Sequence, residues 1–478
     1  MKQAKIFLLL AAVLGLAACN EPSGPATQML LSVNGEHYTV ALPAEENVDL
    51  VTLCTEFETE IEVENASAFN ALAIDGIPMQ NGKCLLAVTE LSDKRQIEIS
   101  YASAGHQGTV YLNTLHSGIP KVASKGQGVI PGDFYLSFIW QQLIMKYDNN
   151  GRLLFYRYTP TKAAGTPDEC GCWDFKKHTF DGKTYYSFHA PDPAFHDRAF
   201  SGYDPGMRVL MDDHYRILKT IHAKPSRDGY LPDGEPIDGH DFYFFSPDHY
   251  ILSAYIDRVV DGDTLAVSYL QEVDNGEVVF DWWSTEHPEM RTWCDPVFDT
   301  HYDYVHFNCI RVLPDGNWLC SFRHLCSVVK IDRAGGTGAI LWRIAGDTLP
   351  EEQRFYGQHY VTMLDDGSIT LFDNGNGHSP QQTKLMHLSV NGETGEVTGG
   401  GDMLPAWSDP YFTSACGAVQ LFDDGSFVAG WGYSGIEGNN NRLVSEYSAN
   451  GVEVFHLRHV APNYMWNAIN SSYRCVKY

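Results

Sequence analysis

Residues 305–323 of the chain read VHFNCIRVLPDGNWLCSFR, and they are the clearest copy of a unit that recurs along it. Two runs rich in β-branched and aromatic residues meet at Pro314-Asp315-Gly316, where the glycine supplies the positive φ of a tight turn. The pattern predicts a β-hairpin. Pairing about this turn returns His306 and Arg323 to nearly the same end, and Asn308 shares a face with His306 because side chains alternate along a strand. These three polar groups, with no opposing carboxylate, indicate an anion site at one rim.

The same layout recurs at residues 358–374 and 415–432, and more loosely at 239–253. Each of the clear copies before residue 400 is followed by a second pair of predicted strands with its own turn. Four strands per unit, recurring every 50 to 70 residues, are typical of propeller blades. Segments 134–156 and 208–218 leave room for two more units. We therefore predict an all-β fold with a six-bladed β-propeller, and five or seven blades stay open because the early copies diverge.

Short alternating strands precede the propeller. From residue 29 onward, turn signals such as Asn34-Gly35 and Asn81-Gly82 separate them. This spacing predicts a small N-terminal β-sandwich domain at residues 29–119, followed by the β-propeller catalytic domain at residues 120–478. No titratable cluster occurs in the first of these domains, so we expect it to be a spacer or docking module.

The N-terminus has the pattern of a bacterial export signal. Lys2 and Lys5 precede an apolar run at residues 6–14, which is too short for a mature membrane span. Leu16-Ala17-Ala18-Cys19 resembles a lipobox. We expect residues 1–18 to be a lipoprotein signal peptide and residues 19–28 a linker after a lipidated Cys19; an ordinary secretory peptide is the alternative. Asn20 resembles outer-membrane sorting patterns, so we expect an outer-membrane lipoprotein of the cell envelope that faces the periplasm or the exterior.

Composition limits the classes of partner. The chain has 478 residues, of which 44% are hydrophobic and 13% aromatic, enough for a large folded core. Lys and Arg number 33 against 60 Asp and Glu, which gives a formal net charge of −27. Such a surface repels the phosphates of nucleic acids and anionic lipid headgroups. We therefore expect no nucleic-acid partner, and a membrane attachment through Cys19 alone.

Cysteine usage fits an oxidising compartment. Apart from Cys19, the chain has ten cysteines, an even number that is compatible with disulfides throughout. Cys54 with Cys84 is the bridge we expect in the N-terminal region. Pairs spaced as CxxC do not recur, so the pattern does not indicate zinc.

Three histidines are in phase with the repeat. The innermost strand of each propeller blade lines the central channel, so equivalent positions in successive blades converge. His240, His306 and His359 begin three successive predicted innermost strands and lie 66 and 53 residues apart. A single histidine is more often structural than catalytic. Three in phase, with Asn308 and Arg323 beside them, predict a catalytic cluster.

These motifs resemble those of the bacterial arylsulfotransferases, exported enzymes that use no nucleotide sulfate donor. The resemblance covers roughly residues 125–478, and its motifs are Gly239-His240-Asp241, His306-Phe307-Asn308 with Arg323, Gln358-His359, and Phe372-Asp373-Asn374-Gly375. It implies a six-bladed propeller after a small β domain. It also implies transfer of a sulfuryl group from a phenolic sulfate donor to a phenol acceptor by a ping-pong route through a sulfohistidine. His359 is then the nucleophile, and His240, His306, Asn308 and Arg323 surround the sulfuryl and phenolic oxygens. Cys416-Gly417 departs from the pattern, because a fourth histidine would be expected there.

The residues fit this chemistry by themselves. Sulfuryl transfer, like phosphoryl transfer, has a loose transition state, so catalysis is chiefly positioning and charge stabilisation. The fork of Arg323 can bind two sulfuryl oxygens and Asn308 can add a neutral donor, so the reaction needs no metal or cofactor. One such donor in a dry site lowers the barrier by about 3 kcal/mol. His359 must be neutral to attack, and a neighbouring Arg323 favours that form.

Several alternatives remain open at this level. Either His240 or His306 could exchange the proton with the phenol, and either Asp373 or Asn374 could orient the ring of His359. A non-catalytic propeller lipoprotein, acting as a binding or assembly module of the envelope, would suit the acidic surface. A metal-dependent hydrolase would use the histidines as ligands, although Arg323 argues against a bound cation. The sequence leaves a homodimer open.

Overall fold

The computed structural model describes residues 24–88, 95–116, 119–138, 142–159, 171–199, 202–293, 295–298, 301–404, 411–433, 442–460 and 472–478. These residues form β-strands joined by loops and short 3-10 turns, so the described chain is all-β, as predicted. No described helix is long and apolar enough to cross a membrane. The expected signal peptide and residues 19–23 of the expected linker, Cys19 included, lie outside the described residues.

The chain divides into two compact units. The first contains residues 1–119 with 145–148 and 152–158, and the second contains the remainder. Two sheets in the first unit have the strand orders β2-β1-β5-β8 and β3-β10-β9-β6-β7. Their bounds are β1 Gln28–Val33, β2 Glu36–Ala41, β3 Val48–Asp49, β5 Thr59–Val63, β6 Ala71–Ile74, β7 Ile77–Pro78, β8 Lys83–Leu86, β9 Gln96–Ser103 and β10 His106–Asn113.

Local sequence explains the first of these sheets. Asn34 and Gly35 both have positive φ, 49° and 85°, and join β1 to β2 in a tight turn. Leu31 and Val33 in β1 are fully buried while the residues between them are not, which is the alternation of a strand with one face on a core. The predicted turn at Asn34-Gly35 is confirmed.

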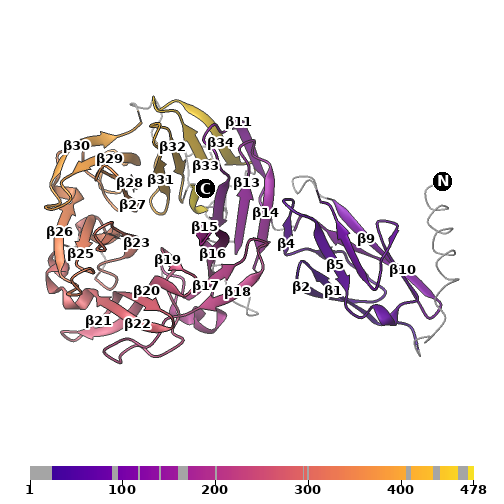
Figure 1. Cartoon of the computed structure of the whole chain (residues 1–478). Helices are drawn as coiled ribbons and strands as arrows, with labels where there is room; N and C mark the ends of the chain where they lie inside the picture. The colour runs from indigo at the N-terminus through magenta and orange to yellow at the C-terminus, as the bar shows by residue number, and fades with distance from the viewer. Residues whose placement is uncertain are drawn as a thin grey trace. The chain divides into compact units, whose positions relative to one another are not determined.

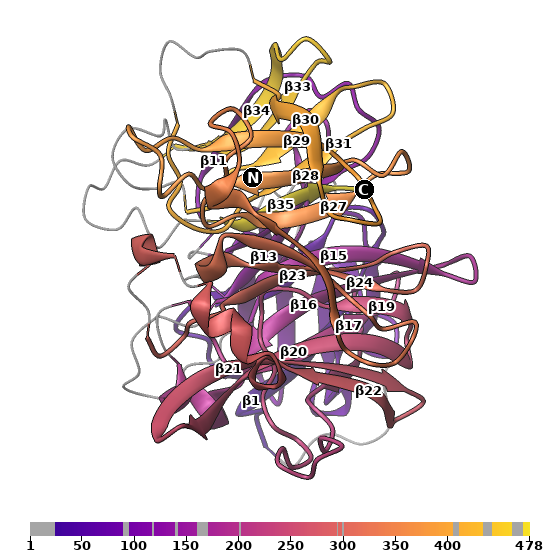
Figure 2. The same ribbon diagram turned by 90° about the vertical axis from the view of Figure 1, so that its left-hand side faces the viewer.

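Six further sheets follow, each of antiparallel neighbours, and in Figure 1 they succeed one another around a common centre with β15, β19, β23, β27 and β31 on the inside. The side view in Figure 2 places β27–β34 towards one end of this unit and β20–β22 towards the other. The strand orders are β35-β12-β13-β14-β4, β15-β16-β17-β18, β19-β20-β21-β22, β23-β24-β25-β26, β27-β28-β29-β30 and β11-β34-β33-β32-β31. The bounds are β4 Thr52–Cys54, β11 Val122–Gly126, β12 Phe134–Phe138, β13 Leu143–Tyr147, β14 Leu153–Tyr158, β15 Trp173–Phe180, β16 Lys183–Pro191, β17 Gly206–Met211, β18 Ile217–Ile221, β19 Tyr243–Ser246, β20 His249–Val260, β21 Asp263–Asp274, β22 Glu277–Trp283, β23 Phe307–Val312, β24 Trp318–Phe322, β25 Ser327–Ile331, β26 Ile340–Ala345, β27 His359–Met363, β28 Ile369–Asp373, β29 Lys384–Val390, β30 Val397–Asp402, β31 Ala418–Leu421, β32 Phe427–Gly430, β33 Arg442–Tyr447, β34 Glu453–His459 and β35 Ser472–Lys477.

The hairpin predicted at residues 305–323 is present. Phe307 pairs with Phe322 and Val312 with Trp318, and Gly316 takes a φ of 79° in the turn. His306 precedes the strand and has a φ of 51°, which is rare for a residue with a side chain. The register is irregular between Phe307 and Cys309. The imidazole of His306 is therefore presented by a strained loop and not by a regular strand.

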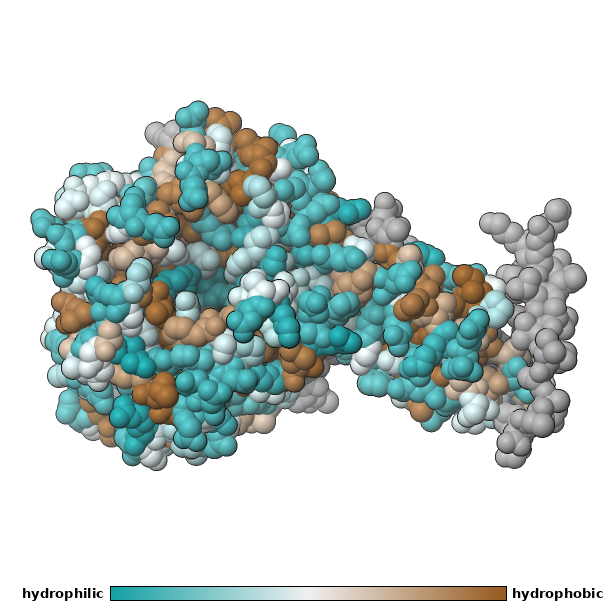
Figure 3. All heavy atoms as spheres, in the orientation of Figure 1, coloured by the Kyte–Doolittle hydropathy of each residue, from teal (hydrophilic) through white to brown (hydrophobic). Residues whose placement is uncertain are grey.

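Aromatic side chains fill the space between neighbouring sheets. Trp282 of β22 stacks on Phe322 of β24, with ring centroids 5.8 Å apart, and Phe280 meets Trp318 edge to face at 5.1 Å. Trp282 and Trp318 are fully buried. The hollow at the centre of this face, by contrast, is lined by hydrophilic residues (Figure 3).

The expected bridge between Cys54 and Cys84 is not formed. Cys54 lies in β4, paired with β14, and accepts a hydrogen bond from the backbone N–H of Glu56. Cys84 lies in β8 opposite Ile61 of β5. The two thiols belong to different sheets, and all eight cysteines among the described residues are unpaired. Proximity in sequence was an insufficient basis for that prediction.

Candidate functional site

His359 begins β27 and its imidazole is held on both sides. Its Nδ1 lies 3.1 Å from the carbonyl oxygen of Gly357 and 2.6 Å from Oδ1 of Asn374, and the backbone N–H of Cys416 points to its Nε2 at 3.3 Å. A carbonyl oxygen only accepts hydrogen bonds, so Nδ1 carries the proton and Nε2 carries the lone pair. The nitrogen with the lone pair is the one that can attack an electrophile.

Asn374, and not Asp373, orients this ring. The amide nitrogen of Asn374 donates to the carbonyl oxygens of Thr413 and Cys416, at 2.8 and 3.0 Å, which directs its Oδ1 towards His359. Asp373 is engaged elsewhere: its carboxylate lies 2.7 Å from Nε2 of His378. The choice that the sequence left open is thereby resolved.

The environment of His359 keeps it neutral. Burial lowers its pKa well below the ordinary value, and the positive charge of Arg323 and the neighbouring His240 lower the pKa further. The imidazole is only 1% exposed. His359 is therefore in its nucleophilic form throughout the physiological pH range.

Arg323 is a half-buried cation without a carboxylate partner in the described part of the chain. One Nη donates to the carbonyl oxygen of Ser414 at 2.9 Å, and the guanidinium lies 4.5 Å above the ring of Phe298. Its Nε is buried and has no hydrogen-bond partner among the described residues. Burial lowers its pKa, but a guanidinium stays charged. A half-buried fork with an unused donor suits an anionic group.

His240 and His306 lie against each other. Their ring centroids are 4.9 Å apart at an interplanar angle of 81°. Nδ1 of His240 is 2.7 Å from the carboxylate of Asp238, and Nδ1 of His306 is bonded to the carboxylate of Asp303. Burial, His240 and Arg323 lower the pKa of His306 well below its ordinary value. Each carboxylate fixes one ring nitrogen as the donor and leaves Nε2 for a reacting group.

These carboxylates correct the prediction that no acidic group would oppose the cluster. Asp238 and Asp303 precede their histidines by two and three residues in the same loops. Burial raises the pKa of Asp303 to about 6, although His324 and His240 act in the opposite direction. An aspartate two or three residues before each of these histidines is a local signal in the sequence that the prediction did not take into account.

Asn308 connects two parts of the cluster. Its amide nitrogen donates to the carbonyl oxygen of Gln358 at 2.7 Å, next to His359, and its Oδ1 is buried without a hydrogen-bond partner among the described residues. The backbone N–H of Arg323 donates to the carbonyl oxygen of His306 at 2.8 Å. Direct contacts thus connect His240 to His306 and His306 to Arg323, and the charges of Arg323, His240 and His306 act on His359. The structure brings all five predicted residues together.

Aromatic rings that the sequence did not single out enclose His240. The centroid of its imidazole ring lies 4.9 Å from the ring centroid of Trp173, 5.8 Å from that of Tyr473 and 5.9 Å from that of Tyr255. The hydroxyl of Tyr473 donates to the carbonyl oxygen of His240 at 2.8 Å. Trp173 and Tyr473 are 300 residues apart in sequence, so only folding reveals that they share this wall.

The described cluster coincides with a family match. Residues 262–460 match the family model for arylsulfotransferase (ASST). This segment of the chain is therefore similar to the arylsulfotransferases. The matched segment includes His306, Asn308, Arg323 and His359, whereas His240 lies before it.

Comparison with other proteins adds little to the arylsulfotransferase match. No curated protein matches the chain. Among solved structures, a protein of unknown function from Bacteroides caccae has a TM-score of 0.43 at 10% identity, covering 73% of this chain and 99% of that one. Virginiamycin B lyase from Staphylococcus aureus has a TM-score of 0.33 at 11% identity, and the match covers 73% of this chain and 90% of that one. A quinonprotein alcohol dehydrogenase-like protein from Bacteroides thetaiotaomicron has a TM-score of 0.36 at 10% identity, and the match covers 91% of this chain and 96% of that one. Scores this low carry no inference about activity.

One group in the arylsulfotransferase domain has the composition of a metal site. One ligand atom each from Asp303, His306 and His324 lies within 4.8 Å of the others. Nδ1 of His324, however, is 2.6 Å from the backbone carbonyl oxygen of Asp303, and burial with the adjacent His306 lowers the pKa of His324 to about 2. These residues could bind a divalent cation, but the nearby charge of Arg323 would oppose it.

Asp241, which follows His240 in the family-like motif, has a structural role. Its buried carboxylate pairs with Lys176 and Arg311 and accepts the backbone N–H of Ile310 at 2.9 Å. Lys176 and Arg311 hold its pKa well below the ordinary value. This carboxylate joins β23 to strands of earlier sheets, so Asp241 supports the arylsulfotransferase cluster from behind.

Proposed function

We propose that the chain is an aryl sulfate sulfotransferase, moving a sulfuryl group from a phenolic sulfate ester to a phenol by a ping-pong route through a sulfohistidine at His359. The observation that supports it most is the pairing, in one buried site, of a neutral His359 and an Arg323 without an ion-pair partner in the described chain. A nucleophile beside a fixed cationic fork fits an anionic ester. The family match agrees with this reaction class.

In the first half-reaction Arg323 and Asn308 donate hydrogen bonds to the sulfuryl oxygens. Nε2 of His359 attacks the sulfur; the N–S bond forms as the S–O ester bond breaks, and the phenolate leaves with that electron pair. A protonated His240 or His306 gives its Nε2 proton to the phenolate. The lowered pKa of His306 disfavours His306 as this proton donor.

In the second half-reaction the acceptor phenol gives its proton to the same histidine. Its oxygen then attacks sulfur, the N–S bond breaks, and His359 returns to its neutral form. The hydrogen bond from Nδ1 of His359 to Asn374 holds the ring through both steps and stabilises the positive charge that develops on it.

The test uses p-nitrophenyl sulfate as donor and phenol as acceptor. We expect nitrophenol release that depends on phenol, and a sulfuryl mass increment on the peptide containing His359 when the acceptor is omitted. His359→Ala should abolish both signals. His214→Ala, at an exposed turn, is the matched control and should keep them. Failure to turn over any aryl sulfate would refute the proposal.

Two other functions remain as alternatives. The group of Asp303, His306 and His324 favours a metal-dependent hydrolase, which predicts one bound divalent metal per chain and loss of activity with a chelator. A non-catalytic binding or assembly module of the envelope predicts neither turnover nor a modified histidine. Metal analysis and the labelling of His359 separate the three.

We extend the proposal to the architecture of the two units and to the location of the protein in the cell envelope. We propose that the six sheets around the common centre are propeller blades, and that the two sheets of the first unit form a β-sandwich over residues 29–119. We also propose processing before Cys19, lipidation of its thiol, and residence in the outer membrane as a lipoprotein. Labelling with a radioactive fatty acid, lost in Cys19→Ala, tests the anchor.

A further inference from the structure

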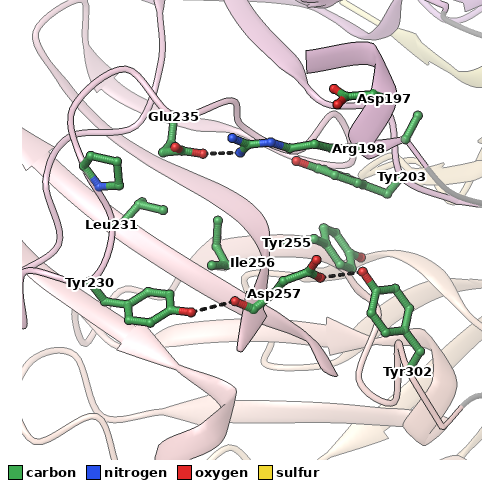
Figure 4. A pocket seen from close by; sticks show the side chains of 12 residues that line it. Asp197, Arg198, Tyr203, Tyr230, Leu231, Glu235, Tyr255, Ile256, Asp257 and Tyr302 are labelled. Atoms are coloured by element: carbon green, nitrogen blue, oxygen red, sulfur yellow. Dashed lines mark hydrogen bonds and ion pairs between the residues drawn. The ribbon is translucent and has the colours of Figure 1, made fainter. Parts of the chain in front are cut away.

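A pocket of about 480 Å³ opens beside the middle of β20. Four tyrosines line it, and Figure 4 shows Tyr203 on one side and Tyr230 on the other, with Tyr255 and Tyr302 at the end near the 197–203 segment. Tyr230 is 48% exposed and therefore offers its ring to a ligand. A cavity of this volume with aromatic walls suits a small aromatic molecule.

The pocket shares a wall with the histidine cluster. The ring of Tyr255 lies 5.6 Å from that of His306 and 5.9 Å from that of His240, and Tyr203 lies 5.1 Å from Tyr255. Gly202 is so close to the cluster that a Cβ added to it would lie 2.7 Å from the imidazole of His306. A molecule in this pocket is therefore adjacent to the two candidate proton donors.

Carboxylates outnumber cations around the pocket. Asp197, Glu235 and Asp257 line it together with one cation, Arg198, which pairs with Glu235. Asp257 is exposed and accepts a hydrogen bond from the hydroxyl of Tyr302, and the hydroxyl of Tyr230 donates to its backbone carbonyl oxygen at 2.8 Å. Such a lining disfavours a sulfate ester and favours a neutral or cationic group.

We infer that this pocket binds the aromatic acceptor, and that it selects phenols carrying a protonated amine. Tyr255 and Asp257 are two residues apart on β20, so they share a face and lie about 7 Å from each other. That spacing matches the reach from a phenolic ring to the amine of an aryl ethylamine. The inference depends on the proposed sulfuryl transfer and adds the class of acceptor.

The test compares two acceptors of the same skeleton, tyramine and 3-(4-hydroxyphenyl)propionate, with p-nitrophenyl sulfate as donor. We expect kcat/KM to favour tyramine, and Asp257→Asn to reduce that preference about fivefold, because a single exposed charge contributes on this scale. Tyr230→Ala should raise KM for both acceptors. Asp248→Asn, with the same charge change in the turn before β20, should leave the preference unchanged.

Binding measurements keep this inference separate from the proposed function. Calorimetry of the full chain with tyramine alone should show binding that Asp257→Asn weakens, whether or not any transfer occurs. Absence of transfer with binding intact would refute the sulfotransferase and retain the pocket. Equal transfer to both acceptors, with no effect of Asp257→Asn, would refute the assignment of the pocket as an amine-selective acceptor site. The proposed sulfotransferase activity would still stand.

Discussion

Two half-buried arginines of the site differ in their partners. Arg311 lies 2.8 Å from the carboxylate of Asp241, whereas Arg323 makes no ion pair with any described residue. An unpaired buried charge destabilises a fold, while removal of one member of a buried pair costs about 3 kcal/mol or more. The difference separates a functional guanidinium from a structural one.

We predict that Arg323→Met lowers kcat/KM for the aryl sulfate donor by about a hundredfold or more, because the sulfuryl oxygens lose a preorganised donor. The melting temperature of the Arg323→Met variant should stay the same or rise. Arg311→Met should instead lower the free energy of unfolding by about 3 kcal/mol, since Asp241 loses a partner. Initial rates and thermal unfolding of both variants check this. Unfolding of Arg323→Met would show that the guanidinium has a structural role.

Asp303 gives the fold a specific dependence on pH. Burial raises its pKa to about 6 from the ordinary 3.8, so between these values the folded chain binds more protons at this position than the unfolded chain. Stability must then fall as the pH rises from about 4 to 6, and stay level above that with respect to this group. Ionised Asp303 is the less stable form in the fold, but it is the form that accepts the hydrogen bond from Nδ1 of His306.

We predict that Asp303→Asn removes this dependence. At roughly 1.4 kcal/mol for each unit between the two pKa values the whole effect is about 3 kcal/mol, of which the unfolding free energy of the variant relative to the native chain should gain about 2 kcal/mol from pH 4 to pH 6. Urea unfolding at a series of pH values measures the difference. A difference that is constant over this interval would contradict the assigned pKa of Asp303.

At the scale of elements, two strands couple the first and last sheets around the centre. β11 completes the sheet of β31–β34, and β35 completes the sheet of β12–β14. Gly430 in β32 lies against the backbone of Cys475 in β35, and a Cβ at Gly430 would come within 2.4 Å of the carbonyl oxygen of Cys475. The close approach of these two strands therefore requires glycine.

We predict that Gly430→Ala lowers the free energy of unfolding by about 2 kcal/mol, because the added methyl group must push β32 away from β35. Gly399→Ala in β30 is the matched control: a Cβ there meets nothing closer than 4.0 Å. The control should be as stable as the native chain or slightly more stable, since alanine loses less backbone entropy than glycine. Melting temperatures of the two variants, measured side by side, test this prediction.

Across the whole molecule, the sequence predicted what depends on local chemistry and on repetition. The turn at Gly316, the recurring hairpins and the phase of His240, His306 and His359 follow from period-two alternation and turn residues. Tyr473 was missed because it reaches His240 only through β35, the last strand, which joins the sheet of β12–β14; Trp173 was missed because it begins β15, in a different sheet from the strand that follows His240. The Cys54–Cys84 bridge was wrong because pairing of thiols depends on which sheet each strand joins, and spacing does not encode that.

Net charge sets how an anionic substrate approaches. The chain carries a formal charge of −27, while the cationic group of the site, Arg323, is half-buried and its Nε is enclosed. At distances beyond about 10 Å at 0.1 M salt, an approaching aryl sulfate is screened from both, but in dilute buffer it meets the repulsion of the whole surface. We therefore predict that kcat/KM for p-nitrophenyl sulfate rises about two- to threefold between roughly 10 and 200 mM sodium chloride. With saturating donor, kcat/KM for neutral phenol should not change over the same series, because a neutral molecule has no long-range attraction to screen. A decrease for the donor would mean that the field of Arg323 extends to the surface and outweighs the acidic groups around it.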